Sequence, residues 1–318
     1  MSARRTVVVT GVCGGLGRVL LRRLLEVPDI DVVGVDKRNW VLDRPERFRF
    51  ERQDLRRSHA EDVIRTAKPW ALVHLAFVSD QRVSRGRRHD VNVVGTNKVL
   101  DWARHHGAQR ICALSRAAVY GARPDNPSLI SEDMPLKLGA AWTESADLVE
   151  YDHLCRSWMW EHRDVEMTVL RPVHLVGRNI REGLLHQLLA RDPVPTALGF
   201  DPMIQLVHEE DVVEAIMLAL LNGGRGIYNV PGPGQLPLSR LLDVLGRRVL
   251  PVPHPLLFAA DRLAFALGRS ALSSAAIDFL RYPCLVDGAR IAEELGYAPK
   301  HGLRETIAAI PGAGSIVA

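Results

Sequence analysis

The first half of the chain alternates short runs of β-branched residues with longer segments whose apolar positions recur every three to four residues. The short runs predict strands at residues 6–10, 31–35, 48–52, 71–75, 110–114 and 165–170. The segments between them predict helices, most clearly at residues 16–25 and 91–105. Apolar strands separated by helices are typical of a parallel sheet with crossover helices. The pattern therefore predicts an α/β fold built on a doubly wound parallel sheet.

The pattern of apolar and polar residues changes in the second half of the chain. Pro and Gly are frequent in residues 192–202 and 231–237, as in the loops of a smaller and less regular lobe. Between these loops the pattern predicts an amphipathic helix at residues 210–221 and a strand at 226–230. The apolar segment at residues 255–267 contains an Asp-Arg pair, so we interpret it as a core or lid helix rather than a membrane contact.

Composition narrows the function classes. A formal net charge of +4 with scattered basic residues gives no reason to expect nucleic-acid binding. No apolar run approaches the roughly 20 residues that cross a bilayer, so no membrane partner is expected. The four cysteines form no CxxC pair, which predicts neither a metal site nor a disulfide framework. Reduced cysteines and a start without a signal-like segment predict a cytoplasmic protein.

The strongest chemical signal is the sequence TGVCGGLG at residues 10–17, between the first strand and the first helix. A GxxGxxG pattern in this context is typical of a dinucleotide-binding turn. Gly11 permits the tight turn, Gly14 lets the backbone approach a pyrophosphate, and Gly17 lets helix and strand pack closely. The N–H groups at the start of the helix, around Gly15 and Leu16, are free to bind the anion.

The end of the second strand bears on the choice of cofactor. Asp36 lies about 20 residues beyond the glycine loop, where a carboxylate accepts hydrogen bonds from the ribose hydroxyls of NAD. Lys37 and Arg38 follow directly, and their charges suit the additional phosphate of NADP. The residues therefore favour NAD(H) and leave NADP(H) open.

Further motifs appear in order along the chain. They are Asp54-Leu55, His74-Leu75-Ala76, Asn92-Val93 with Gly95-Thr96, Val119-Tyr120-Gly121 and Arg171-Pro172. With the glycine loop, they make the chain resemble an extended short-chain dehydrogenase/reductase of the NAD-dependent epimerase/dehydratase family, from Thr6 to about Thr306. The resemblance implies a Rossmann-type fold in which Asp54 and Leu55 lie against the adenine. It also implies that Leu75, Ala76, Asn92 and Pro172 line the cofactor.

The same resemblance suggests a division of the chain. We expect a NAD(P)-binding Rossmann domain at residues 1–175, with residues 205–222 packing back on it. Residues 176–204 and 226–300 are expected to form a small C-terminal substrate-binding lobe, and residues 311–318 a loose tail. Such proteins commonly dimerise through two helices per subunit, so a homodimer is a further expectation that no residue here establishes.

The catalytic pattern of the family is broken in this chain. Its enzymes carry Ser or Thr four residues before the tyrosine of VYG, and here that position is Arg116, preceded by Ser115. They also carry a YxxxK pair, in which the lysine lowers the pKa of a proton-transferring tyrosine. No YxxxK occurs here; Tyr151 lies nearest to the expected place, and Cys155 stands where the lysine would be.

Four residues are candidates to replace the missing pair. Ser115 or Tyr151 can hydrogen-bond a substrate carbonyl, Arg116 can stabilise a developing oxyanion, and His174 can transfer a proton. Each has a structural alternative: a strand-end hydrogen bond for Ser115, packing for Tyr151, a salt bridge for Arg116 and a core position for His174.

The substrate side of the pattern also differs from the family. Sugar-nucleotide enzymes of this type place an arginine where this chain has Ile204, and an acid where it has Gln205. Isoleucine cannot bind a diphosphate, so a bulky, non-nucleotide ketone, such as a natural-product intermediate, is the favoured small-molecule substrate. Three hypotheses stay open: an atypical NAD(P)H-dependent ketoreductase, a sugar-nucleotide epimerase or dehydratase, and a non-catalytic NAD(P)-binding sensor or scaffold.

Overall fold

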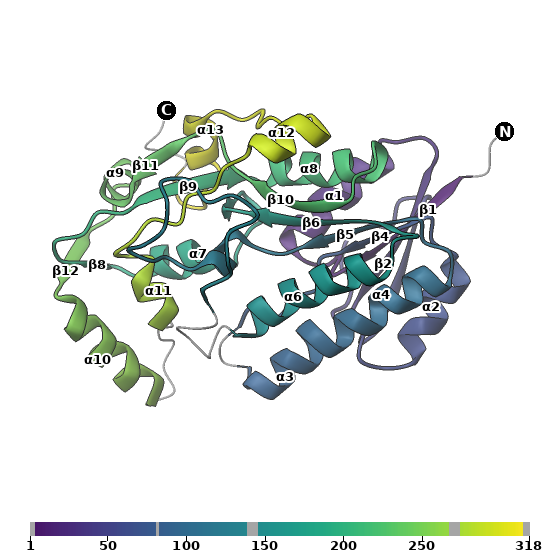
Figure 1. Cartoon of the computed structure of the whole chain (residues 1–318), viewed down its shortest axis with the longest axis horizontal. Helices are drawn as coiled ribbons and strands as arrows, with labels where there is room; N and C mark the ends of the chain where they lie inside the picture. Colours follow the sequence, from purple (N-terminus) through teal and green to yellow (C-terminus); the bar gives the residue numbers. More distant parts are fainter. Residues whose placement is uncertain (1–3, 81–82, 139–145, 267–273, 314–318) are drawn as a thin grey trace.

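A seven-stranded parallel sheet forms the centre of the molecule in the computed structural model, which describes residues 4–80, 83–138, 146–266 and 274–313 (Figure 1). Its strands are β1 (Arg5–Thr10), β2 (Ile30–Asp36), β3 (Phe48–Arg52), β4 (Ala71–His74), β5 (Arg110–Leu114), β6 (Glu166–Pro172) and β10 (Gly226–Val230). Their spatial order is β10-β6-β5-β4-β1-β2-β3, with every pairing parallel. The order reverses direction at β1, so the sheet is doubly wound, as the sequence predicts.

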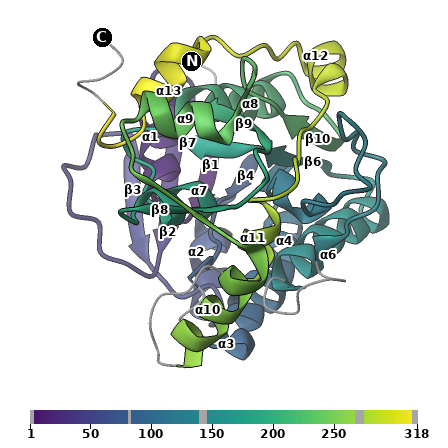
Figure 2. The ribbon, with the colours of Figure 1, turned by 90° about the vertical axis from the view of Figure 1, so that its left-hand side faces the viewer.

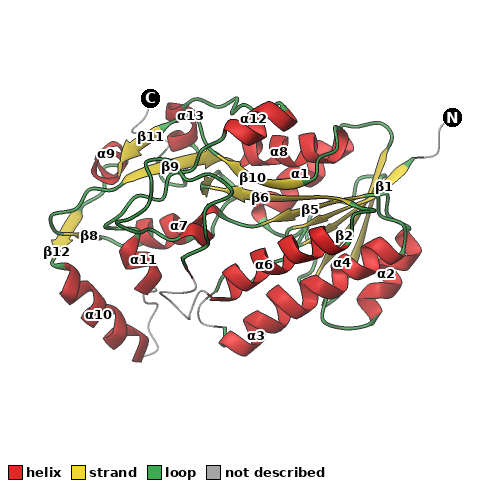
Figure 3. Ribbon diagram, in the orientation of Figure 1, coloured by secondary structure: helices red, strands yellow, loops and turns green. Residues whose placement is uncertain are grey.

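Helices cover both faces of this sheet (Figure 3). One face carries α2 (His59–Ala67), α4 (Thr96–His105) and α6 (Ala146–Glu161), with α3 (Arg85–His89) and the π-helical turn η1 (Asp90–Gly95) leading into α4. The other face carries α1 (Gly15–Leu25), α8 (Glu209–Leu221) and α12 (Ala289–Leu295). Valines of β1 alternate between the two faces: Val7 and Val9 pack on the α1 side, and Val8 on the α2 side. A sheet buried on both faces explains why its strands are apolar throughout.

A smaller lobe is built from short elements after β6. Its strands form a three-stranded sheet, β11-β9-β7, and a two-stranded sheet, β12-β8. Figure 2 views the molecule from the side of this lobe. The strands are β7 (His174–Val176), β8 (Val194–Ala197), β9 (Met203–His208), β11 (Gln235–Pro237) and β12 (Val249–Val252). The helices are α7 (Leu184–Leu189), α9 (Leu238–Val244), α10 (His254–Ala266), α11 (Ser274–Asp278) and α13 (Leu303–Ala308). A third apolar cluster, separate from the two beside the central sheet, holds this lobe together.

The six strands predicted in the first half are present, within one or two residues of their expected ends. The helix expected at 91–105 begins as the π-helical turn η1 and becomes α-helical only at Thr96. The apolar segment predicted from residue 255 onward is helix α10 as far as Ala266, and residue 267 lies outside the described residues. Within the described ranges no helix is long and apolar enough to cross a membrane.

Two boundaries of the expected lobe differ from the structure. Residues 226–230 were assigned to the lobe, but they form β10, which pairs with β6 at the edge of the central sheet. This pairing satisfies the backbone N–H and C=O groups on the outer side of β6 and makes β10 the edge strand. The tail expected from residue 311 is not loose at its start: Ala313 is buried in the apolar cluster of the lobe. The remainder of that tail lies outside the described residues.

Candidate active site

The glycine loop closes against the end of the neighbouring strand β4. Gly11 has φ +73°, and a Cβ there would lie 2.8 Å from the backbone nitrogen of Ala76. A Cβ on Gly17 would lie 2.8 Å from the Cα of Val12, so helix α1 can approach β1 only without a side chain at that position. Both positions therefore require glycine. The same contact brings Ala76, a predicted cofactor-lining residue, directly against the loop.

No side chain of the N-cap residue occupies the first N–H groups of helix α1, so these groups are available to an anion. The N-cap residue, Gly14, provides no side-chain hydrogen bond. The first N–H groups of an α-helix, here those around Gly15 and Leu16, have no partner within the helix. Together with the helix dipole, such donors form a common phosphate-binding arrangement. The residues present thus fit the pyrophosphate of a dinucleotide.

A segment from the lobe lies over this helix start, which the sequence does not predict. A Cβ on Gly15 would come within 2.1 Å of the carbonyl oxygen of Asn179. Glu209 fixes the segment, because its carboxylate accepts hydrogen bonds from Asn179 N at 3.1 Å and Asn179 Nδ2 at 2.9 Å. The one sequence signal for this contact is that Gly15 is a glycine beyond those the GxxGxxG pattern needs.

Asp36 is buried at the end of β2, and its carboxylate is fully hydrogen-bonded. Oδ1 accepts from Arg38 N and Nε at 3.0 and 3.1 Å, while Oδ2 accepts from Cys13 N and Arg38 Nη2, both at 3.0 Å. Four acceptances use the full capacity of a carboxylate. A ribose diol can therefore bind Asp36 only after the half-exposed Arg38 side chain swings away. Lys37, also a predicted cofactor residue, is exposed.

Asp54 and Leu55, expected at the adenine, follow β3. The Asp54 carboxylate accepts hydrogen bonds from Arg56 Nη2 at 2.6 Å and Nε at 3.0 Å, and these bonds lower its pKa to about 2. Leu55 is buried in the apolar cluster beside α2 and α4. Asp54 and Leu55 thus lie at the carboxyl end of β3, where an adenine is expected. The negative charge of Asp54 is already compensated by Arg56.

His74 and Asn92 fix the loop that continues β4. Asn92 Oδ1 accepts from Val78 N at 2.8 Å, and Asn92 Nδ2 donates to Val78 O at 3.0 Å. Thr96 Oγ1 donates to Asn92 O, so it accepts from His74 Nε2, and the other ring nitrogen accepts from Thr10 Oγ1. His74 is therefore neutral, and burial lowers its pKa to about 4. The bonds hold the backbone of Leu75 and Ala76 in place beside the glycine loop.

Ser115 lies at the carboxyl end of β5 but belongs to a buried polar network. Its hydroxyl donates to Asp152 Oδ2 at 2.5 Å. The Asp152 carboxylate also binds Arg171 Nε and Nη2, and both charged side chains are essentially inaccessible to solvent. Arg171 in turn donates to the hydroxyl of Tyr120, which donates to Asn229 on β10. The catalytic role predicted for Ser115 would require it to leave this network.

Asp152 was not singled out from the sequence, although it organises the network. The available signal was a carboxylate on the stripe of α6 that otherwise holds Tyr151, Cys155 and Trp158. An acid among buried apolar residues indicates a buried cationic partner, and Arg171 within strand β6 is that partner.

Tyr151 projects from α6 into the core. Its ring packs edge-on against Phe77, with centroids 5.5 Å apart, and stacks 6.2 Å from the ring of His74. Burial raises its pKa well above the ordinary tyrosine value, and a hydrogen bond with Cys155 adds to this effect. A lysine would act in the opposite direction. Tyr151 is thus near the cofactor-lining loop, but as a neutral, enclosed phenol; its proposed catalytic role stays a prediction.

Arg116 follows Ser115 and, unlike it, forms no hydrogen bond with another described side chain. Its guanidinium lies 5.3 Å from the ring centroid of Phe77. No hydrogen bond or ion pair joins it to any residue in the part of the chain that the structure describes. Burial lowers the pKa of Arg116, while the charges of Glu182 and Asp147 raise it. A cation therefore stands at the carboxyl end of β5 with its donors unused.

His174 begins β7, two residues beyond Pro172 at the end of β6. Its ring packs edge-on against Phe279 at 6.2 Å, and burial lowers its pKa to about 4. At neutral pH it is therefore an unprotonated imidazole, able to accept a proton but not poised to give one. Pro172 is buried and pairs with Val230 in the sheet.

The substrate-side positions are explained by packing. Ile204 is buried in the apolar cluster of the lobe. Gln205 forms two hydrogen bonds with the backbone of Val286, donating to its carbonyl at 3.2 Å and accepting from its N–H at 2.8 Å. Both residues hold β9 in place, and neither offers a positive charge.

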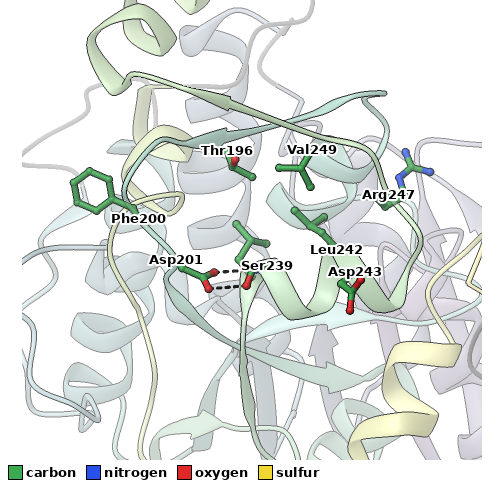
Figure 4. A pocket seen from close by; sticks show the side chains of 9 residues that line it. Thr196, Phe200, Asp201, Ser239, Leu242, Asp243, Arg247 and Val249 are labelled. Carbon is green, nitrogen blue, oxygen red and sulfur yellow. Dashed lines mark hydrogen bonds between the residues drawn. The ribbon is translucent and has the colours of Figure 1, made fainter.

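A hollow in the lobe lies apart from all these residues (Figure 4). It lies between α9 and the strands β8 and β12, and the Asp201 carboxylate on its wall accepts from Ser239 N and Oγ. None of its lining residues is a predicted cofactor or catalytic residue. Within the described residues no cluster of His, Cys, Asp or Glu could hold a metal ion.

The fold and the glycine loop define a Rossmann-type dinucleotide-binding protein. A family model described as the NAD dependent epimerase/dehydratase family matches residues 7–231. The chain belongs to this family, as the resemblance stated above predicts.

Similar proteins align over nearly the whole of this chain. An uncharacterised protein of Mycobacterium tuberculosis is 30% identical over 93% of this chain and 80% of its own. A dTDP-glucose 4,6-dehydratase of Neisseria meningitidis is 26% identical over 95% and 92%. Among solved structures, DesIV, a dTDP-glucose 4,6-dehydratase of Streptomyces venezuelae with NAD bound, is similar with a TM-score of 0.73, 25% identity, and 95% and 94% coverage.

Proposed function

We propose that this protein is a NAD(H)-dependent oxidoreductase that reduces a ketone on a bulky small molecule that is not a nucleotide. The observation that carries the proposal is the guanidinium of Arg116, which binds no carboxylate among the described residues, beside an intact dinucleotide cradle. Phe77, against which Arg116 lies, directly follows Ala76, and Ala76 abuts Gly11 of the glycine loop. A positive charge is thus available close to where the cofactor is expected to end.

The cradle supports NAD(H) as the cofactor. Gly11 and Gly17 require their close backbone contacts, the start of α1 offers N–H groups, and Asp36 can accept a ribose diol once Arg38 moves. When bound, the nicotinamide supplies the hydride. Use of NADP(H) is the alternative that Arg38 and Lys37 keep open, because the displaced Arg38 would be free to bind a phosphate.

The chemistry we assign to this chain is mainly electrostatic. As a C–H bond forms at the ketone carbon, the electron pair of the carbonyl bond moves to oxygen, and Arg116 stabilises the resulting negative charge. A proton from water then completes the alcohol, because Tyr151 is enclosed and His174 is unprotonated near neutral pH. Positioning of the ketone beside the cofactor contributes the rest of the acceleration.

A second candidate is a dinucleotide-binding sensor or scaffold without catalysis. The supporting observation is that Ser115 and Tyr151 are both engaged in the core, so the usual proton-transfer groups of the family are missing. A sugar-nucleotide reaction is supported by the names of the relatives. The buried Ile204 counts against it, since it leaves no cation for a diphosphate at that position.

The test is a screen by nicotinamide absorbance. NADH and NADPH binding is measured first, and oxidation is then followed with aromatic and polycyclic ketones and with UDP- and dTDP-sugars. Ketone-dependent oxidation that persists in Tyr151→Phe is the expected result. Tight cofactor binding without turnover on any of these compounds would favour the sensor, and turnover of a nucleotide sugar would overturn our assignment of the substrate. The cytoplasmic location and the homodimer remain predictions from the sequence.

A further inference from the structure

Arg116 differs from the other arginines near the proposed cofactor site. Arg38, Arg56 and Arg171 each bind a carboxylate through two nitrogens of the guanidinium. Arg116 makes no such bond to any described residue, although its side chain is only partly exposed. An arginine that is removed from water without a counter-charge is unfavourable. As far as the described residues show, Arg116 thus lacks a counter-charge in direct contact.

The two acids whose charges act on Arg116, Asp147 and Glu182, do not complete it. Asp147 is buried and already bound, since Asn92 Nδ2 donates to it at 2.7 Å and Arg88 forms an ion pair with it at 3.5 Å. Glu182 is exposed and accepts a hydrogen bond from Ser79 Oγ at 3.2 Å. Both act on Arg116 only at a distance. They also limit the charge that can be added, so the missing partner is a single negative charge rather than a polyphosphate.

A transient charge does not meet this need. An alkoxide on a ketone exists only while hydride moves, whereas the guanidinium is desolvated whenever substrate is bound. A permanent anion on the substrate compensates Arg116 in the ground state and leaves N–H groups over for the reacting oxygen, because a guanidinium carries five donors. The planar guanidinium suits a planar carboxylate, which it can bind through two parallel hydrogen bonds.

We propose that Arg116 binds a carboxylate of the substrate, so that the ketone reduced by this protein is a keto acid. The inference rests on the proposed function, since it places the substrate beside the cofactor. Phe77 contributes to it by holding the guanidinium over its ring, 5.3 Å from the ring centroid. Arg116 is thus the residue that selects an acid over its neutral counterpart.

Binding of two probes of matched shape tests this without turnover. Benzoylformate and benzoylformamide differ in charge but share a ring and a ketone, and the ketone lies directly beside the acid or amide, within reach of one guanidinium. Their dissociation constants are measured by calorimetry on the full chain loaded with NAD⁺, which has no hydride to transfer to the ketone. We expect the acid to bind about ten-fold more tightly than the amide, the size of one charge-assisted hydrogen bond. The preference should disappear in Arg116→Gln and survive in part in Arg116→Lys.

The matched control is Arg65→Gln on α2, an exposed arginine whose ion pair is on the surface. It should keep the full preference. An Arg116→Gln protein that still prefers the acid, or a wild-type protein that does not prefer it, would overturn the inference. Failure of the proposed reduction gives a different result: acid preference with no NADH oxidation. A thermal melt of Arg116→Gln separates misfolding from loss of binding, since removal of an unpaired cation should not lower Tm.

Discussion

The carbonyl oxygen of Asn179 lies directly over Gly15, so that the lobe and the start of helix α1 meet with no room for a methyl group. Glu209 holds Asn179 from the other side through hydrogen bonds to its backbone and side-chain nitrogens. The contact joins the proposed pyrophosphate site to the lobe that is expected to bind substrate. The position of the lobe and the shape of the proposed pyrophosphate site are therefore linked through these three residues.

Replacement of Gly15 by alanine should displace this contact. We expect NADH affinity to fall about ten-fold or more, because the new methyl group pushes Asn179 off the helix start where the anion is bound. Fluorescence titration with NADH measures the effect. Gly86→Ala is the matched control, since nothing lies within 4 Å of the Cβ it would gain. Equal NADH affinity in both variants would show that the contact has no part in cofactor binding.

Replacement of Ser115 by alanine should cost stability rather than activity. The variant loses a hydrogen bond to the buried Asp152 carboxylate, and such bonds contribute about 2 kcal/mol. We expect the free energy of unfolding in urea to fall by that amount while kcat changes less than about two-fold, well under the loss of a catalytic group. A large fall in kcat at unchanged stability would instead establish Ser115 as a substrate-orienting hydroxyl.

The Asp36–Arg38 pair should set the choice between the two cofactors. In Asp36→Ala the acceptor for the ribose diol is lost and Arg38 is released, so NADH affinity should fall about ten-fold while NADPH affinity is kept or rises. Arg38→Ala should act the other way, since it frees the carboxylate and removes the phosphate partner. Titration of both variants with both cofactors decides the point. Parallel losses for NADH and NADPH in the two variants would contradict it.

Stability should depend on pH through His74. Its pKa in the folded protein is about 4, below the ordinary value of 6.5, so the unfolded chain binds a proton more readily. The stabilisation is therefore complete above pH 6.5 and is lost as pH falls toward 4, by about 3 kcal/mol at most. Urea unfolding across this range should show less pH dependence in His74→Asn than in wild type. Identical slopes in the two proteins would show that His74 is not buried as a neutral ring.

The strands and the glycine loop were predictable from the sequence because their signals are local. Short β-branched runs such as residues 6–10 favour buried strands, and the glycine spacing indicates a turn that forms locally. The partners of Ser115 and Asn179 were not predictable in the same way. Ser115 Oγ binds a residue 37 positions away, and Asn179 meets Gly15 across two lobes. Sequence spacing does not indicate contacts between residues so far apart in the chain, so only part of the candidate site could be predicted from the sequence.

The position of β10 has a consequence for how the chain is made. Six strands of the central sheet are contained in residues 5–172, but the seventh, which covers the edge of β6, arrives only with residues 226–230. During synthesis on the ribosome, the edge of β6 therefore stays unpaired until about two-fifths of the remaining chain has been made and β10 can pair with it. A fragment that stops at residue 175 would keep that edge open permanently and invite pairing between copies. A chain truncated at the apparent boundary between the halves would therefore expose an unpaired sheet edge.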